Sequence, residues 1–222
     1  MKSHVMLLMA TTLLLSTVSL AGNKKSDPVG DIDKKPGAWC EDLQTDLVST
    51  DFNRVGDEFV VQMEMTKEIK KDVGYKEYYF WLDINHPNGG YQPYNPQSVA
   101  WPDLQANYRI YYSINANVDS DEPVDEKIAY QPCMNGGDCS QDQGMLQDNK
   151  IKVSIDKKTV TFRWPVSLLP EMAKAKNIRV GYTTYFEHQG CNGEDDSPQW
   201  GRNAFKINLQ PALPLPPAPP AL

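Results

Sequence analysis

Apolar side chains recur at every second position along much of this chain, and this period of two constrains the fold more than any other feature. A period of two puts alternate side chains on opposite faces, as in a β-strand with one buried face. Residues 58–66 and 108–118 both show it. Their predicted inward side chains are Phe59, Val61, Met63, Met65, Tyr108, Ile110, Tyr112, Ile114 and Ala116.

Other segments continue the pattern. Residues 150–164 read as a hairpin that turns at Asp156–Lys158, and residues 177–187 and 204–209 read as two more strands. The only helix candidate is 167–176, where Pro170 suits a first turn. Many short strands with almost no helix predict an all-β fold: a two-sheet antiparallel β-sandwich, jelly-roll or immunoglobulin-like, with at most one short helix.

The two ends of the chain differ from this middle part. Residues 1–21 have a basic start, an apolar run and small residues near Ala21, which is typical of a cleavable secretory signal. Residues 22–39 read as a flexible polar segment, residues 40–209 as the β-sandwich domain, and residues 210–222 as a Pro-rich tail that is a spacer, a short ligand or a remnant. We therefore expect an exported protein, secreted, periplasmic or on the cell surface, with no transmembrane segment in the mature chain.

The 222 residues contain four cysteines, an even number that in an exported chain favours disulfides. Cys133 and Cys139 bracket a turn-forming run, which would leave Cys40 to pair with Cys191. A metal site is the alternative, although the spacing lacks paired C-x-x-C motifs.

The net charge of −7 would repel phosphate backbones, so nucleic acid is not an expected partner. No sequence motif of a serine hydrolase, zinc protease or phosphate-binding loop occurs. Asp83 with Glu187 or Glu64 could form a glycosidase pair, but acidic residues are too common here to single them out. Catalysis therefore stays undecided.

The strand expected at residues 78–85 has two different faces. Tyr78, Phe80, Leu82 and Ile84 would point inward, while the other face would carry Tyr79, Trp81, Asp83 and Asn85. Aromatic rings beside hydrogen-bonding groups suit a sugar, whose C–H faces stack on rings and whose hydroxyls need polar partners. The alternative is that both faces are covered and that Tyr79 and Trp81 pack under a loop.

The loop that follows brings Asp83, Asn85 and Asn88 close together in the chain. Such oxygen ligands could hold calcium, although the helix–loop–helix calcium pattern is absent. The alternative is a turn in which the same side chains bond the backbone. The acidic stretches 118–126 and 192–201 could also bind a cation, or form solvated loops.

The strand order, Asp83 at a strand end, the Trp164–Pro165 step and the "DSP" at 196–198 resemble the DOMON-like superfamily of β-sandwiches, which includes family 9 carbohydrate-binding modules. The resemblance implies a non-catalytic module that binds a ligand, most often carbohydrate. Trp101 and Trp200 would then join Trp81 as candidate ligand contacts. Haem, bound in some such proteins, would need axial ligands among Met63, Met65, His86 and His188, of which the methionines follow a core pattern.

The expected function is thus the binding of a glycan or another cell-envelope component by an exported β-sandwich. A structural or adhesive envelope protein that contacts another protein is the alternative, followed by a glycoside-active enzyme. Oligomeric state stays open.

Overall fold

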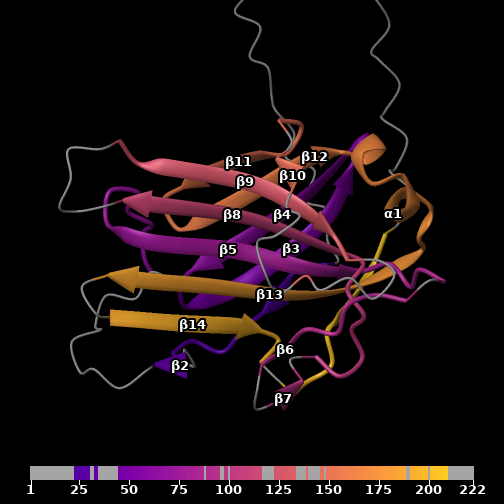
Figure 1. The fold of residues 1–222 in the computed structure, drawn as a ribbon, viewed down its shortest axis with the longest axis horizontal. Helices are drawn as coiled ribbons and strands as arrows, with labels where there is room; N and C mark the ends of the chain where they lie inside the picture. Colours follow the sequence, from indigo (N-terminus) through magenta and orange to yellow (C-terminus); the bar gives the residue numbers. More distant parts are fainter. Residues whose placement is uncertain are drawn as a thin grey trace, which may run out of the picture.

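Two antiparallel sheets pack face to face, as Figure 1 shows, which confirms the predicted fold class. The computed structural model describes residues 23–30, 33–34, 45–87, 89–95, 98–99, 101–116, 123–133, 139, 146–147, 149–188, 191–199 and 201–209. None of the helices in these ranges is long and apolar enough to cross a membrane.

The first sheet, here sheet A, has five strands in the order β1-β3-β4-β12-β11. Neighbouring strands are paired antiparallel throughout, and β11 and β12 form a hairpin. The strands are β1 (Lys25–Ser26), β3 (Leu47–Val55), β4 (Glu58–Met65), β11 (Lys152–Asp156) and β12 (Thr159–Pro165).

The second sheet, here sheet B, follows the order β10-β9-β8-β5-β13-β14-β2, with β15 paired to one end of β13. Figure 1 shows β9, β8, β5, β13 and β14 side by side in one layer. The strands are β2 (Asp33–Lys34), β5 (Gly74–Asp83), β8 (Tyr108–Ala116), β9 (Asp125–Pro132), β10 (Leu146–Gln147), β13 (Asn177–His188), β14 (Cys191–Ser197) and β15 (Phe205–Asn208). A separate hairpin, β6 (Tyr94–Asn95) with β7 (Ser98–Val99), lies in the long connection between β5 and β8.

The main core fills the space between the two sheets. At its centre the Phe80 ring lies 5.1 Å from Phe162, edge to face, and 5.9 Å from Trp164, stacked. Phe80 comes from sheet B and the other two come from sheet A, so these contacts tie the layers together. The alternating side chains predicted to point inward on β4 and β8 lie in this core or at its edge.

The predicted hairpin and helix are also present. β11 and β12 are joined at Lys157, whose positive φ of 51° suits the tight turn. A 3-10 turn (Val166–Leu168) leads into α1 (Pro170–Lys174), which has Pro170 in its first turn. Within residues 22–39, Lys25–Ser26 and Asp33–Lys34 pair with the sheets as short edge strands.

Candidate functional site

The outer face of sheet B, turned away from the core, divides into two halves along the strands. At one end, which we call the covered half, a loop layer packs over β5 at Trp81 and Asp83. At the other end, which we call the open half, β5 presents Tyr75, Glu77 and Tyr79. Both halves lie on the same face of β5, because their residues are two positions apart along the strand. The two halves therefore differ in what covers them.

The covered half contains a second apolar cluster, separate from the main core. Its members are Trp81, Tyr91, Trp101, Leu104, Ala106, Cys133, Cys139 and Ala204, with Tyr79 packed against its edge. Cys133 and Cys139 form the predicted disulfide. Cys191 is also disulfide-bonded, and its predicted partner Cys40 lies outside the described residues.

Trp101 anchors the loop layer to the sheet. A side-chain carbon added at Gly181 would lie 2.6 Å from the Trp101 ring, so the indole occupies the space that any larger residue on β13 would fill. The Trp101 Nε1 donates a hydrogen bond of 2.6 Å to the Pro198 carbonyl. Absence of a side chain at Gly181 therefore allows the loop to pack directly on the strand.

These packing contacts bury two of the tryptophans that were predicted to contact a ligand. Trp101 is 0% exposed and Trp81 is 6% exposed, and the Trp81 ring lies 5.6 Å from the ring of Tyr91. Trp81 thus follows the alternative in which the strand is covered by a loop, and neither indole presents a free face. Tyr79 is half-buried at the boundary, and Trp200 lies outside the described residues.

Asp83 and Asn85 form the turn that was the alternative to a calcium site. The Asp83 Oδ1 accepts a hydrogen bond of 2.6 Å from the backbone N–H of Asn85, which has a φ of 56°. The Asp83 Oδ2 accepts from the Arg179 Nη1 at 3.2 Å and from the backbone N–H of Gln105 at 3.2 Å. Both carboxylate oxygens are therefore engaged, and a cation would have to displace Arg179.

Asn88, the third residue of the predicted calcium set, lies outside the described residues. Within the described part of the chain, no group of three or more His, Cys, Asp and Glu side chains could hold a metal ion. Met63 and Met65, considered as haem ligands, are buried in the main core.

Arg109 of β8 lies at the boundary between the halves. Its guanidinium lies 4.5 Å from the Tyr79 ring centre, 5.2 Å from that of Trp81 and 5.3 Å from that of Tyr111. The Arg109 Nη1 also reaches the Cys139 carbonyl at 3.4 Å, and the residue is only 6% exposed. A buried cation among three rings holds the aromatic side chains of both halves in place.

The open half is made of tyrosines and acids in register on four strands. Tyr79 lies opposite Tyr111 and Thr183, and Glu77 lies opposite Tyr185. The remaining members of the open half are Tyr75, Glu187, Glu194 and Asp196. Tyr75, Tyr79 and Tyr185 are half-buried, so each ring combines a packed edge with an accessible part.

A hydrogen-bond network joins the centre of the open half. The hydroxyl of Tyr111 donates to the Glu77 Oε1 at 2.9 Å, the Tyr75 hydroxyl bonds the same oxygen, and the two hydroxyls lie 2.8 Å apart. Burial raises the pKa of Tyr111 to about 12, and burial together with the Glu77 contact raises the pKa of Tyr75. These hydroxyls therefore stay protonated as donors at neutral pH.

The second edge of the open half is acidic. The Thr183 Oγ1 donates to the Asp196 Oδ1 at 2.5 Å, and the Tyr185 hydroxyl donates to the Glu187 Oε2 at 2.9 Å. Loss of solvent, followed by the nearby charge of Glu194, raises the pKa of Asp196 well above its usual range. The open half thus offers hydroxyls, carboxylates and ring faces on one rigid surface.

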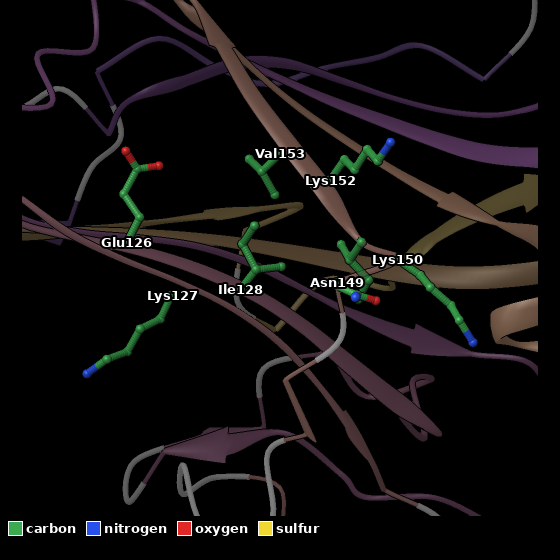
Figure 2. A pocket seen from close by; sticks show the side chains of 8 residues that line it. Glu126, Lys127, Ile128, Asn149, Lys150, Lys152 and Val153 are labelled. Atoms are coloured by element: carbon green, nitrogen blue, oxygen red, sulfur yellow. The ribbon is translucent and has the colours of Figure 1, made fainter.

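Cavities occur at two other places. Two polar ones, of about 350 and 360 Å³, meet at Asp83, Asn85 and Arg179. A larger one of about 1030 Å³ lies between β9 and the edge strand β11. Figure 2 shows Ile128 and Val153 facing this space, while the amino groups of Lys127, Lys150 and Lys152 point away from it. Its charged groups do not converge, so we assign it no ligand.

No family model matches the chain, and no curated protein matches it.

Sequence reasoning named Tyr79 as a ligand contact and Glu187 only as half of a possible glycosidase pair, and it missed Tyr75, Glu77, Tyr111 and Tyr185. Tyr111 and Tyr185 lie in strands that the alternation predicted, whereas Tyr75 and Glu77 lie in the part of β5 that precedes the strand expected at 78–85. The neighbours of all four across the sheet depend on strand order. The acidic run at 192–201, expected as a cation site or a loop, contains strand β14. A strand can include these acids because Asp195 is buried and accepts a hydrogen bond from the Leu47 backbone N–H at 2.6 Å.

Proposed function

We propose that this chain is an exported, non-catalytic ligand-binding module that binds a glycan on the open half of sheet B. The observation that carries the proposal is the set of half-exposed rings of Tyr75, Tyr79 and Tyr185 beside carboxylates on one rigid sheet. Carbohydrate recognition needs both kinds of group, since rings cover the C–H faces of sugars and polar groups bind their hydroxyls.

The spacing of the rings supports an extended ligand. The Tyr75 and Tyr185 ring centres are 6.2 Å apart, edge to face, and those of Tyr79 and Tyr111 are 6.3 Å apart. The half-exposed rings of Tyr75 and Tyr79 on β5 and of Tyr185 on β13 belong to adjacent strands, so a chain of sugars crossing these strands would meet them in succession, while the buried Tyr111 of β8 packs beside Tyr79. A sheet holds such rings with little loss of side-chain freedom on binding.

The acids and hydroxyls supply the polar part of the surface. Glu77 already accepts from two tyrosines, which orients both hydroxyls toward one place. Glu187, two residues after Tyr185 on β13, accepts a hydrogen bond from the Tyr185 hydroxyl, and Glu194 lies opposite Tyr185 on β14. Sugar hydroxyls, which both donate and accept, match such a mixture of groups.

Trp81 and Asp83 have indirect roles in this proposal. Trp81 packs 6.1 Å from the Tyr79 ring and, with Arg109, supports it from the covered half. Asp83 orders the adjoining loop through Asn85 and Arg179. Export is supported by the Cys133–Cys139 disulfide and by the leader expected at residues 1–21, because disulfides persist in oxidising compartments.

The resemblance to DOMON-like sandwiches remains a prediction that agrees with this fold class. It favours binding without catalysis, as does the engagement of Glu77 by two hydroxyls.

A glycan array followed by pull-down on the retained polysaccharides tests the proposal. Tyr185→Ala removes an accessible ring and should weaken retention about tenfold, the equivalent of about 1.4 kcal/mol. The matched control is Gln62→Ala, because Gln62 is exposed on the outer face of sheet A. Retention should be unchanged in this control.

Two results would overturn the proposal. One is that the wild-type chain is retained by no glycan, and the other is that Tyr185→Ala and Tyr75→Ala both bind as the wild type does. If the wild type instead releases new reducing ends from a glycan and Glu77→Gln does not, the same surface has a glycoside-cleaving activity.

A further inference from the structure

We infer that the cleft between Asn85 and Lys206 is a binding site for a small oxyanion: a sulfate, a phosphate or a carboxylate group. The cleft is the cavity of about 350 Å³ at the end of β5, and it lies outside the open half. The inference does not depend on glycan binding, since it rests on different residues and a different ligand chemistry.

Cationic groups converge on this cleft from two strands and a turn. Arg179 of β13 lies directly opposite Lys206 of β15. Lys176 precedes β13, and its carbonyl accepts a hydrogen bond of 2.9 Å from the backbone N–H of Leu209, which fixes that turn next to β15. The cleft is therefore lined by three cations and one carboxylate, that of Asp83.

The local charge is opposite to that of the whole chain, whose net charge is −7. Asp83 does not offset the cations toward a ligand, because it is 4% exposed and accepts three hydrogen bonds, two from backbone N–H groups and one from Arg179. An anion that enters the cleft thus meets cations at its surface while the carboxylate faces inward.

Two ion pairs hold the Arg179 guanidinium in a fixed plane and leave N–H donors that can bind a ligand. Its Nη1 lies 3.2 Å from Asp83 and its Nε lies 3.3 Å from Asp103, while 39% of its side chain is exposed. A guanidinium carries five N–H donors, so contacts with two carboxylates leave other donors for a ligand. Planar, oriented donors of this kind are suited to oxyanions, whose oxygens can accept two parallel hydrogen bonds.

Lys176 and Lys206 supply mobile charge at the mouth of the cleft. Both side chains are exposed, and neither takes part in an ion pair with another described residue. Asn85 adds a side-chain amide donor at the opposite wall, from a backbone that Asp83 holds in the left-handed conformation. Three charges and an amide around one small cavity match a compact ligand with several acceptor oxygens.

Thermal unfolding of the full-length protein in sulfate, phosphate or glucuronate, at constant ionic strength with chloride as reference, tests the site. The melting temperature of the wild type should rise and saturate with at least one of these anions. The double variant Lys176→Met/Lys206→Met should need about tenfold more anion for the same rise. The matched control is Lys150→Met/Lys152→Met, which removes the same charge from residues that line a different cavity and should behave as the wild type.

The anion that saturates identifies the source: glucuronate alone indicates a uronic acid, whereas sulfate or phosphate indicates an inorganic or ester group. No saturable rise with any anion would overturn the site, and so would an equal rise in wild type and double variant. If the double variant is unfolded in chloride, the two single variants replace it. Each single variant should then need about threefold more anion than the wild type for the same rise in melting temperature. The double variant should retain glycans as the wild type does. Failure of the anion site would therefore not affect the proposal that the open half binds a glycan.

Discussion

The covered and open halves of sheet B are built on the same strands but differ in how far their side chains are buried. On β5, Trp81 and Asp83 are buried under the loop layer, with their partners supplied by Arg109, Arg179 and the backbone. Four to eight residues earlier, Tyr75 and Glu77 are half-buried and are linked to each other and to Tyr111. An aromatic and acidic strand face is therefore no guide to a binding site until its cover is known.

The energetic consequences of the two halves should differ as much as their burial. Side chains of the covered half should contribute mainly to stability, because their removal leaves a cavity. The half-exposed side chains of the open half should contribute little to stability and more to binding. The predictions below test this contrast, beginning with the largest expected effect.

Trp101→Ala should lower the free energy of unfolding by about 3–5 kcal/mol, because it empties a fully buried indole site and leaves the Pro198 carbonyl without its donor. Equilibrium unfolding in urea measures this value. Tyr185→Ala is the partner measurement and should cost less than about 1.5 kcal/mol, since its ring is half-exposed. Equal losses in the two variants would remove the contrast between the halves.

Replacing Cys133 and Cys139 by alanine should cost about 2 kcal/mol, the value expected for closing so short a loop. The disulfide packs in the same cluster as Trp81, so acrylamide should quench indole fluorescence more strongly in the double variant. Unchanged quenching together with unchanged stability would mean that the disulfide does not hold the loop layer on the sheet.

Two buried charges on β5 sharpen the comparison further. Asp83 is paired with Arg179, whereas Lys76, 0% exposed at the other end of the strand, donates to the Val73 carbonyl and lies 5.3 Å from the Phe186 ring centre. Burial lowers the pKa of Lys76 to about 8 from its ordinary 10.5. Lys76→Met should therefore stabilise the protein at pH 7 by about 2 kcal/mol.

The stability gained by Lys76→Met should depend on pH, because folding and proton binding at Lys76 are linked. Between pH 8 and 10.5 the unfolded chain binds a proton at Lys76 that the folded chain has lost, so the wild type becomes more stable relative to the variant as pH rises. Below pH 8 the difference should be constant. Urea unfolding of both proteins at pH 7, 8.5 and 9.5 measures it, and a gap that does not narrow would contradict the assignment to Lys76.

The smallest effect is expected from Glu77→Gln. The amide oxygen can still accept from the hydroxyls of Tyr75 and Tyr111, although the bonds lose the strength that the negative charge gives them. We expect a loss of about 1 kcal/mol in the free energy of unfolding. A loss as large as that of Trp101→Ala would show that the open half is part of the structural framework.

Much of the fold could be predicted because a period of two is a local property. The inward residues of β4 and β8, the hairpin near Lys157 and the helix at Pro170 all follow from residues close in the chain. Strand β14 could not be predicted this way, since the buried Asp195 accepts a hydrogen bond from the Leu47 backbone N–H, which is far away in sequence.

The candidate site was less predictable for the same reason. The alternation correctly gave the two faces of β5, but it could not show that Gly181 on another strand makes room for Trp101, which helps to cover Trp81. The neighbours of Tyr79 across the sheet, Tyr111 and Thr183, depend on β8 and β13 flanking β5. Strand order is a long-range property that periodicity does not contain.

An NMR titration with the retained glycan tests the central claim most directly, by following the aromatic signals of both halves in one experiment. Binding on the open half predicts shifts for the rings of Tyr75, Tyr79 and Tyr185, while the indole signals of Trp81 and Trp101 stay in place. Shifts of the two indoles with unmoved tyrosines would contradict it and would locate the ligand under the loop layer.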